Sequence, residues 1–317
     1  MISNGSVRVP GALQYDVVSV QSLVVYGRVG NSVAVPALEA LGLTVASVPS
    51  VVLSNTPDYP TLHGGALPLD WFTGYLEDLD RRGALESLRA VLTGYLGTAE
   101  QAGALAAWIR ALQARRPNLR VVVDPVLGDS EDGLYVDPDL AAAVRRDLVP
   151  LADGLTPNGF ELGYLTGMPV DDIDSVLAAA RTLLTGRTRW VAVTSAASDP
   201  AEPPDAEGSR EIRVVLVTRT GSWLLSHPRL EDVPKGTGDL FCATLTGHWL
   251  GGADVSEAAT RACQHLVRVL RLTQQANCGE LLAAPMGFCD GDMGDIIVRQ
   301  IGVRPLASPF MFRPEMS

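Results

Sequence analysis

Apolar strand-like segments and helix-like segments alternate along most of the 317 residues of this chain, and this alternation limits the possible folds most. Segments 121–123 (VVV) and 190–193 (WVAV) have no polar face, and residues 98–116 show apolar positions at helical spacing after a capping Thr98. Strands without a polar face are typical of parallel sheets that helices cover on both sides. The sequence therefore predicts an α/β fold, a three-layer sandwich with a mostly parallel central sheet.

Three segments are expected to depart from this regular pattern. Residues 211–227 read as an antiparallel hairpin, and residues 43–54 read as a strand that Pro49 interrupts. Residues 195–210 are rich in proline and acidic side chains, so we expect a surface loop.

Composition limits the classes of molecule that the chain is expected to bind and the cell compartment in which it is expected. The formal net charge is −11, whereas binding to nucleic acid needs clustered cations, so a nucleic-acid partner is disfavoured. No apolar run approaches the length of a membrane span, and the first residues, MISNGSVRVPG, lack the apolar core of a signal peptide. The four cysteines show no CxxC spacing and are expected to be buried free thiols, which predicts a reducing compartment and a cytoplasmic protein.

Polar residues follow the predicted strands, where open α/β sheets bind ligands. Because the carboxyl ends of parallel strands share one edge of the sheet, these side chains are candidates for a common site. They are Ser22, Asn55, Tyr95, Asp124, Asn158, Thr194 and the turn 236–239.

The turn Gly236-Thr237-Gly238-Asp239 precedes the helical run LFCATLTGHWL. Unpaired backbone N–H groups and the positive end of the helix dipole lie at such a start, and glycines let an anion approach closely. A carboxylate beside an anion cradle makes sense if it takes a proton from a hydroxyl that attacks a phosphate. Lys235, the only lysine in the chain, would offset charge on the transferred group. From this motif alone, Asp239 as a simple helix cap stays an alternative.

Motifs of competing enzyme classes are absent from the sequence. We find no GxxxxGK[ST], no GxGxxG after the first strand and no G-x-S-x-G. The four histidines show no HExxH or paired spacing, so we interpret them as surface or packing residues rather than metal ligands.

Several segments together resemble the pyridoxal kinases of the ribokinase-like superfamily, from about Val17 to Ala276. The segments are SVQSLVVYGRVGN (19–31), VVLSNTPDY (51–59), LTGYLG (92–97), VVVDPVLGD (121–129), LADGLTPNGFELGYLTG (151–167), VAVTS (191–195) and GTGDLF (236–241). The resemblance implies one ribokinase-like kinase domain over residues 1–317, with residues 1–15 and about 279–317 matching poorly. It also implies ATP-dependent phosphorylation of the 5′-hydroxyl of pyridoxal, pyridoxine or pyridoxamine.

The resemblance assigns the catalytic and substrate-binding residues. It implies that Asp239 is the catalytic base and that Gly236, Thr237 and Gly238 form the anion hole for the γ-phosphate. For the vitamin B6 ring it implies a hydrogen bond from Ser22, a stacked Tyr95 and a covering Tyr135. These residues, with Pro57 and Asp58 in the loop after the second strand, are the candidate substrate contacts.

The resemblance also assigns the nucleotide and metal side. It implies that Asp124, Asn158, Glu161, Thr194 and Ser195 contact ATP or its cations, and we add the hypothesis that Lys235 reaches the phosphates. Asp124, Asp129 and Glu161 are the candidate ligands of Mg²⁺. A capping box is the alternative for Asn158 and Glu161, which are three residues apart. The family pattern further implies a homodimer and leaves open a monovalent cation such as K⁺.

The loop SNTPDY departs from the family's usual SNHTxY. Thr56 stands where a histidine is common, and Pro57 offers neither the hydroxyl nor the N–H of the usual threonine. Asp58 would compensate only by changing the ring preference. A kinase of a related pyrimidine such as hydroxymethylpyrimidine therefore stays an alternative, as does a non-catalytic protein that binds a B6 vitamer. In the tail, DGDMGD (290–295) lacks the final glutamate of a calcium loop, so we expect an acidic turn.

Overall fold

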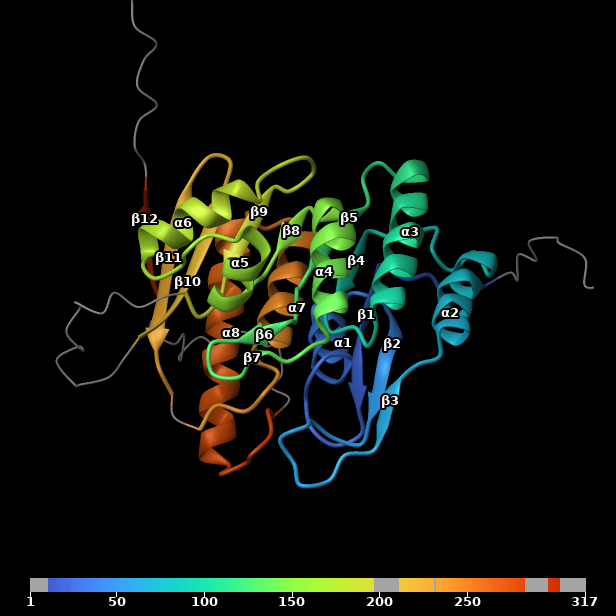
Figure 1. Ribbon diagram of the computed structural model, residues 1–317, viewed down its shortest axis with the longest axis horizontal. Helices are drawn as coiled ribbons and strands as arrows, with labels where there is room; N and C mark the ends of the chain where they lie inside the picture. Colours follow the sequence, from blue (N-terminus) through green and yellow to red (C-terminus); the bar gives the residue numbers. More distant parts are fainter. Residues whose placement is uncertain (1–10, 197–210, 231, 283–295, 303–317) are drawn as a thin grey trace, which may run out of the picture.

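The computed structural model describes residues 11–196, 211–230, 232–282 and 296–302 (Figure 1). Among these residues, ten strands form one sheet in the order β12-β11-β10-β9-β8-β5-β4-β1-β2-β3. The strands are β1 (Val17–Val24), β2 (Val45–Leu53), β3 (Gly64–Ala66), β4 (Ala90–Thr93), β5 (Arg120–Val123), β8 (Gly154–Leu155), β9 (Trp190–Val193), β10 (Glu211–Thr218), β11 (Ser222–Pro228) and β12 (Ile297–Ile301).

The middle of the sheet is parallel and its two ends are antiparallel. Strands β9, β8, β5, β4, β1 and β2 pair in parallel, which confirms the mostly parallel sheet. Strands β10 and β11 form the predicted hairpin, and β3 adds an antiparallel edge beside β2. Strand β12 lies in the poorly matched tail and pairs with β11.

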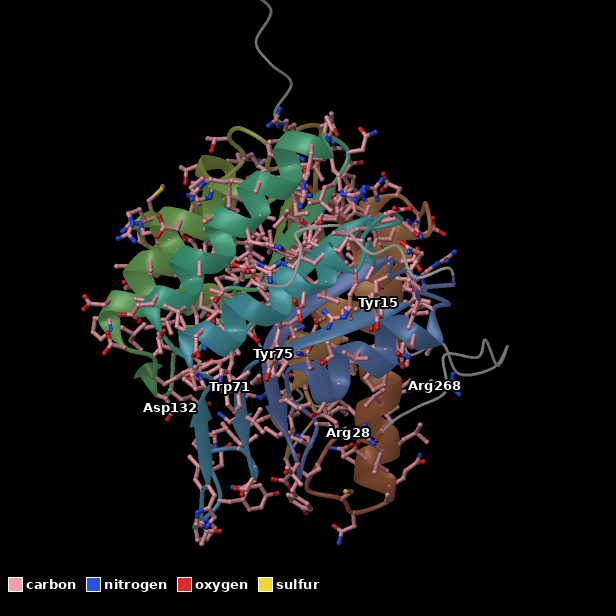
Figure 2. The ribbon with its side chains drawn as sticks, turned by 90° about the vertical axis from the view of Figure 1, so that its right-hand side faces the viewer. Tyr15, Arg28, Trp71, Tyr75, Asp132 and Arg268 are labelled. Carbon is pink, nitrogen blue, oxygen red and sulfur yellow. The ribbon has the colours of Figure 1, made fainter. Side chains whose placement is uncertain are left out.

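Helices cover both faces of the sheet, as the continuous apolar strands predicted. Side chains alternate across a strand, and Val121 and Val122 accordingly enter two different apolar cores. Figure 2 shows the sheet between the two helical layers. One core lies under α2 (Leu69–Arg81), α3 (Ala99–Arg115), α4 (Pro138–Ala143), α5 (Gly159–Thr166) and α6 (Ile173–Thr182). The other lies under α1 (Asn31–Ala40), α7 (Thr237–Leu250) and α8 (Val255–Gln275).

Two local predictions need correction or completion. Pro49 does not interrupt its strand, because β2 continues through it and the pairing with β1 only shifts register between Gln21 and Leu23. The sequence of residues 137–152 also predicts one helix, and the structure divides it into α4 (Pro138–Ala143), a π-helix at Val144–Leu148 and a 3₁₀ turn at Val149–Leu151. Residues 197–210 of the expected surface loop and the expected acidic turn at 290–295 lie outside the described residues.

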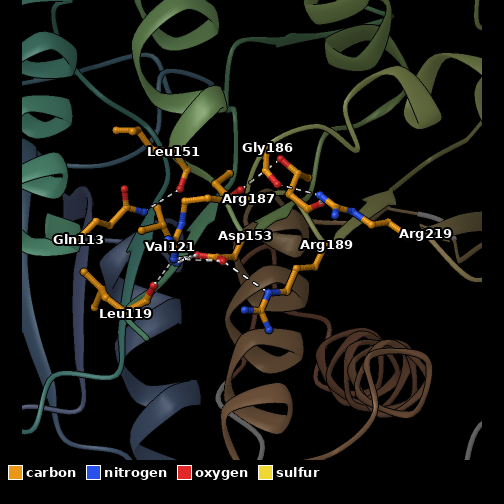
Figure 3. A network of polar contacts seen from close by, with 11 residues as sticks. Gln113, Leu119, Val121, Leu151, Asp153, Gly186, Arg187, Arg189 and Arg219 are labelled. Atoms are coloured by element: carbon orange, nitrogen blue, oxygen red, sulfur yellow. Dashed lines mark hydrogen bonds and ion pairs between the residues drawn. The ribbon is translucent and has the colours of Figure 1, made fainter. Parts of the chain in front are cut away.

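A buried carboxylate fixes the amino-terminal edge of the sheet (Figure 3). Asp153 is 1% exposed and accepts a hydrogen bond from the backbone N–H of Val121 at 3.0 Å. The guanidinium groups of Arg187 and Arg189 lie 3.3 and 3.6 Å from its oxygens. These contacts hold the starts of β5, β8 and β9 together. The three strands therefore keep fixed positions relative to one another up to their carboxyl ends at the opposite edge of the sheet.

None of the helices in the described part of the chain is both long enough and apolar enough to span a membrane.

Candidate active site

The turn 236–239 begins α7 in a conformation that only glycine tolerates at its first position. Gly236 is the N-cap with φ +96°, and a Cβ there would lie 2.0 Å from the carbonyl oxygen of Arg28. Gly236, as the N-cap, has no side chain that could cap the helix, so the first N–H groups are available to an external acceptor. The sequence prediction of a helix start at this turn is confirmed.

Asp239 lies in the first turn of α7 and does not cap its own helix. Its Oδ2 accepts a hydrogen bond of 2.8 Å from the backbone N–H of Gly30, which is 209 residues earlier in the chain. Burial raises the pKa of Asp239 to about 6, while the Gly30 N–H lowers it. The carboxyl group is therefore mainly ionised at neutral pH, yet basic enough to accept a proton from an alcohol in a transition state.

The loop between β1 and α1 brings Ser22 to the same place. Gly30 packs so closely on Ser22 that a Cβ at residue 30 would lie 2.3 Å from the Ser22 Oγ. Since the N–H of Gly30 binds Asp239, the serine hydroxyl and the carboxylate flank one glycine. The structure thus brings together two predicted residues from opposite ends of the sequence.

Two further carboxyl groups lie near Asp239 and are buried. Asp124 follows β5, is 6% exposed, and accepts a hydrogen bond from the Thr156 hydroxyl at 2.8 Å. Burial raises its pKa well above the usual value, and the charges of Asp239 and Glu161 raise it further. Burial also raises the pKa of Glu161 to about 8. Within the described residues none of these three groups forms an ion pair, so the cluster is acidic and not neutralised by the protein.

Glu161 and Asn158 organise the loop beside this cluster. The Glu161 oxygens accept hydrogen bonds from the backbone N–H groups of Leu127 and Asn158, and the Asn158 side chain donates to the Gly128 carbonyl. Asn158 and Glu161 also form a capping box at the start of α5. The capping box is therefore present, and the two side chains hold the loop that leads to β6 (Gly128–Asp129) and β7 (Gly133–Leu134); their contact with ATP or its cations stays a prediction.

The three predicted metal ligands do not converge on one position. Asp129 accepts hydrogen bonds from the backbone N–H groups of Glu131 and Asp132, in its own turn. Among the described residues, no three His, Cys, Asp or Glu side chains are grouped so that they could hold a metal ion. Within the described residues Asp124, Asp129 and Glu161 therefore form no cage of three direct ligands, and their role toward a metal ion stays a prediction.

Lys235 lies beside the same turn rather than against the start of α7. Its Nζ is 3.9 Å from an oxygen of Asp132 and 4.0 Å from one of Asp129, and the side chain is half exposed. The long lysine thus pairs with the acidic turn 129–132. Its contact with a nucleotide stays a prediction.

A cavity of about 560 Å³ opens beside the start of α7. Its polar lining includes Thr194 and Ser195 after β9 and Thr237 and Gly238 at the helix start. An isolated parallel bridge between Asn158 and Thr194 extends the sheet to this point. Four residues predicted to contact ATP thus line one cavity.

The predicted ring-binding residues do not line this cavity. Tyr95 is half-buried and follows Gly94, which packs on Gln21 beside Ser22. Partial burial raises the pKa of Tyr135, and the nearby carboxylates of Glu161, Asp124 and Asp239 raise it further. Pro57 and Asp58 are both exposed in the loop between β2 and β3.

Sequence reasoning missed a contact that joins three segments near this loop. The Tyr59 hydroxyl donates a 2.5 Å hydrogen bond to Glu280, and the Tyr59 ring packs edge-on against Tyr26 at 5.5 Å. The Glu280 carboxylate also lies over Gly27, where a Cβ would come within 2.8 Å of it. Glu280 lies just beyond the segments that the sequence analysis compared with the family, so none of those motifs indicated this role.

Comparisons with known proteins agree with this geometry. A family model described as phosphomethylpyrimidine kinase matches residues 84–284. The chain is 57% identical over 272 residues to a pyridoxine/pyridoxal/pyridoxamine kinase of Bordetella bronchiseptica, covering 86% of this chain and 94% of that protein. It is 33% identical over 267 residues to a pyridoxal kinase of Corynebacterium diphtheriae, covering 84% and 92%. A solved pyridoxal kinase of Leishmania donovani in complex with ADP and pyridoxamine has a TM-score of 0.77 and 28% identity, covering 90% and 99%.

Proposed function

The chain belongs to the pyridoxal kinase family, and we propose that it transfers the γ-phosphoryl group of ATP to the 5′-hydroxyl of pyridoxal, pyridoxine or pyridoxamine. The observation that carries this proposal is Asp239, a base of raised pKa held by Gly30 beside Ser22 and at the start of an uncapped helix. The proposal treats the chain as one kinase domain, since one sheet includes strands from residue 17 to residue 301.

Each part of the site has a role in this transfer. Asp239 accepts the proton of the 5′-hydroxyl while the oxygen forms a bond to the γ-phosphorus and the bond to the β-bridging oxygen breaks, releasing ADP. The N–H groups at the start of α7 stabilise the negative charge on the transferred group. Ser22 and Tyr95 hold the pyridine ring, and the cavity beside Thr194 and Gly238 holds the nucleotide. Such transfer depends mostly on positioning and charge stabilisation.

The acidic cluster fits a magnesium ion that arrives with the nucleotide. Mg²⁺ usually takes one or two carboxylates together with phosphate oxygens and water, so it does not need a cage of three side chains. Asp124 would hold the ion, because the oxygens of Glu161 already accept backbone hydrogen bonds. A bound Mg²⁺ neutralises phosphate charge. A monovalent cation stays a prediction of the family resemblance.

The proposal is tested by turnover with the purified protein, ATP and Mg²⁺. Pyridoxal, pyridoxine, pyridoxamine and hydroxymethylpyrimidine are offered separately, and phosphorylated products are identified by mass spectrometry. We expect phosphorylation of the B6 vitamers, and loss of at least about a hundredfold in kcat for Asp239→Asn, because a missing general base typically costs this much. Asp171→Asn, an exposed residue away from the site, is the matched control and should retain full activity.

The same experiment separates the alternatives. Phosphorylation of the pyrimidine in preference to every B6 vitamer would replace the proposed substrate class. Binding of a vitamer without any product would favour a non-catalytic binding protein. An Asp239→Asn protein as fast as the parent would contradict the proposed base.

We also propose a homodimer and a cytoplasmic location. The first is supported by an apolar patch on α2, where Leu69, Trp71 and Tyr75 are 42%, 56% and 41% exposed (Figure 2). Light scattering should give the mass of a dimer, and Trp71→Ser should weaken it; a monomer at micromolar concentration would contradict this surface. The second is supported by Cys242 and Cys263, which are buried free thiols.

A further inference from the structure

The nucleotide cavity has an apolar part that lies away from the start of α7. Ile212 and Val214 of β10 form one wall, and Leu266 and Leu270 of α8 form another. Since the polar lining at Thr194 and Gly238 suits phosphates, the apolar part suits a planar base. A base bound there can be recognised only by the few polar atoms that the walls present.

His227 of β11 is on this apolar wall. It pairs across the hairpin with Ile212, and Val214 pairs with Leu225, so these side chains share one face of the sheet. The histidine is 4% exposed and lines the cavity. It is therefore a buried polar ring beside the apolar walls of the cavity, which Arg229 and Asp232 also line.

The hydrogen-bonding state of the ring follows from its neighbours. Nδ1 lies 3.0 Å from the carbonyl oxygen of Pro228, and because a carbonyl oxygen only accepts, Nδ1 carries the proton and donates it. Burial lowers the pKa of His227, so the ring is neutral at pH 7. Nε2 is then an unprotonated acceptor, and it lies on the far side of the ring from the Pro228 carbonyl.

This acceptor has no partner within the part of the chain that the structure describes. A buried polar atom without a partner costs stability, and native proteins keep such atoms mainly where a ligand or water completes them. His227 borders the cavity, but its Nε2 is itself closed to solvent, so a ligand in the cavity reaches this atom only with a small shift of the neighbouring side chains. The missing group must be a hydrogen-bond donor.

We propose that His227 Nε2 reads the exocyclic 6-amino group of adenine and thereby selects adenine nucleotides over 6-oxopurine nucleotides. This inference rests on the proposed function, since it concerns the phosphoryl donor of the same reaction. An amino group donates to Nε2, whereas the 6-oxo group of hypoxanthine or guanine is an acceptor that faces a second acceptor. Sites that hydrogen-bond a ligand group reject analogues that lack it, because the buried partner is left unpaired.

The test compares ADP with IDP, which differ on the 6-position edge of the purine, by calorimetric titration, and ATP with ITP by KM. We expect the unaltered protein to prefer ADP by about tenfold or more, as one well-made hydrogen bond allows. His227→Leu should reduce that ratio to within about threefold. His227→Gln should accept both nucleotides, because its amide can present either a carbonyl or an amino group. His248→Leu, outside the cavity, should keep the ratio of the unaltered protein.

A His227→Leu protein that keeps the full ADP preference would overturn the inference. If this variant does not fold, the unaltered protein is titrated with the diphosphate of purine riboside, which lacks the 6-amino group, and an affinity equal to that of ADP would overturn the inference equally. Nucleotide titration needs no vitamer turnover. An ADP preference that depends on His227 in a protein without B6 product would therefore support this inference while contradicting the proposed function.

Discussion

Asp239→Asn should stabilise the folded protein at neutral pH while it removes the proposed catalytic base. The pKa of this carboxyl rises from 3.8 to about 6 in the folded state, so folding disfavours its ionised form. Each pKa unit corresponds to about 1.4 kcal/mol, which gives an upper limit of about 3 kcal/mol at pH 7. The side chain keeps some contact with solvent, so we expect a gain of about 1 to 3 kcal/mol from the neutral amide.

The sign of the effect depends on pH in a defined window. The folded-state pKa lies above the unfolded value, so the ionised group costs stability above pH 6, and this cost disappears as pH falls toward 3.8. Urea unfolding of both proteins at pH 7.5 and at pH 4 measures the difference, and Asp171→Asn controls for the loss of one charge. Equal stability at both pH values, or a less stable variant at pH 7.5, would refute the reasoning, since a charge held against its solvation must have a cost.

Three further outcomes follow from the site. In the unaltered enzyme, kcat/KM should rise through pH 6 and fall about tenfold per pH unit below it, as Asp239 takes up a proton; a pH–rate profile flat from 5 to 8 would exclude this group as the base. Gly236→Ala should destabilise the fold by about 2 kcal/mol or more and abolish turnover, because the added Cβ meets a backbone carbonyl. Gly42 also has a positive φ but faces open space, so Gly42→Ala is the control and should lower the melting temperature less. Tyr59→Phe and Glu280→Gln should each raise the vitamer KM about three- to tenfold with little change in kcat, and unchanged KM values would show that their contact does not order the substrate loop.

The layered fold was predictable because its signal is local and repeated. Consecutive residues in strands such as β5 are apolar, although their side chains point to opposite faces of the sheet. In the structure Val121 packs in one core and Val122 in the other. Pro49 was misread because proline usually ends a strand, yet β2 continues through it where the pairing with β1 shifts. Such a shift depends on the partner strand, which one segment does not reveal.

The sequence predicted those parts of the site whose chemistry depends on one short segment. The glycines at 236 and 238 and the carboxylate at 239 indicate an anion-binding helix start, and α7 begins there. The hydrogen bond from Gly30 to Asp239 joins residues 209 positions apart, so no local pattern contains it. The spacing of Asn158 and Glu161 suits a capping box and a cation site equally; the backbone contacts show the capping box, and the cation site stays a prediction.

His227 and Glu280 show a different limit of sequence reasoning. A histidine in a strand carries no sign of which ring nitrogen is protonated, because that depends on the Pro228 carbonyl and on the walls around it. Glu280 follows α8, and its role is recognised only from the contacts that it makes with Tyr59 and Gly27 in the structure. Contacts between distant segments decide both roles.

The buried carboxyl groups of the site give it an unbalanced negative charge in the free protein. Asp124 and Glu161 are buried near Asp239, and no described cation pairs with any of them, so ionising all three has a cost in the free protein. In the proposed reaction, a nucleotide that carries Mg²⁺ would bring positive charge to Asp124, while Asp239 would stay free to accept a proton. Lys235, which precedes the turn 236–239, pairs with the acidic turn at 129–132 instead. The proposed function therefore implies that the site is unfavourable alone and becomes balanced when the metal-bearing nucleotide and the alcohol are both bound, which would couple substrate binding to the readiness of the base.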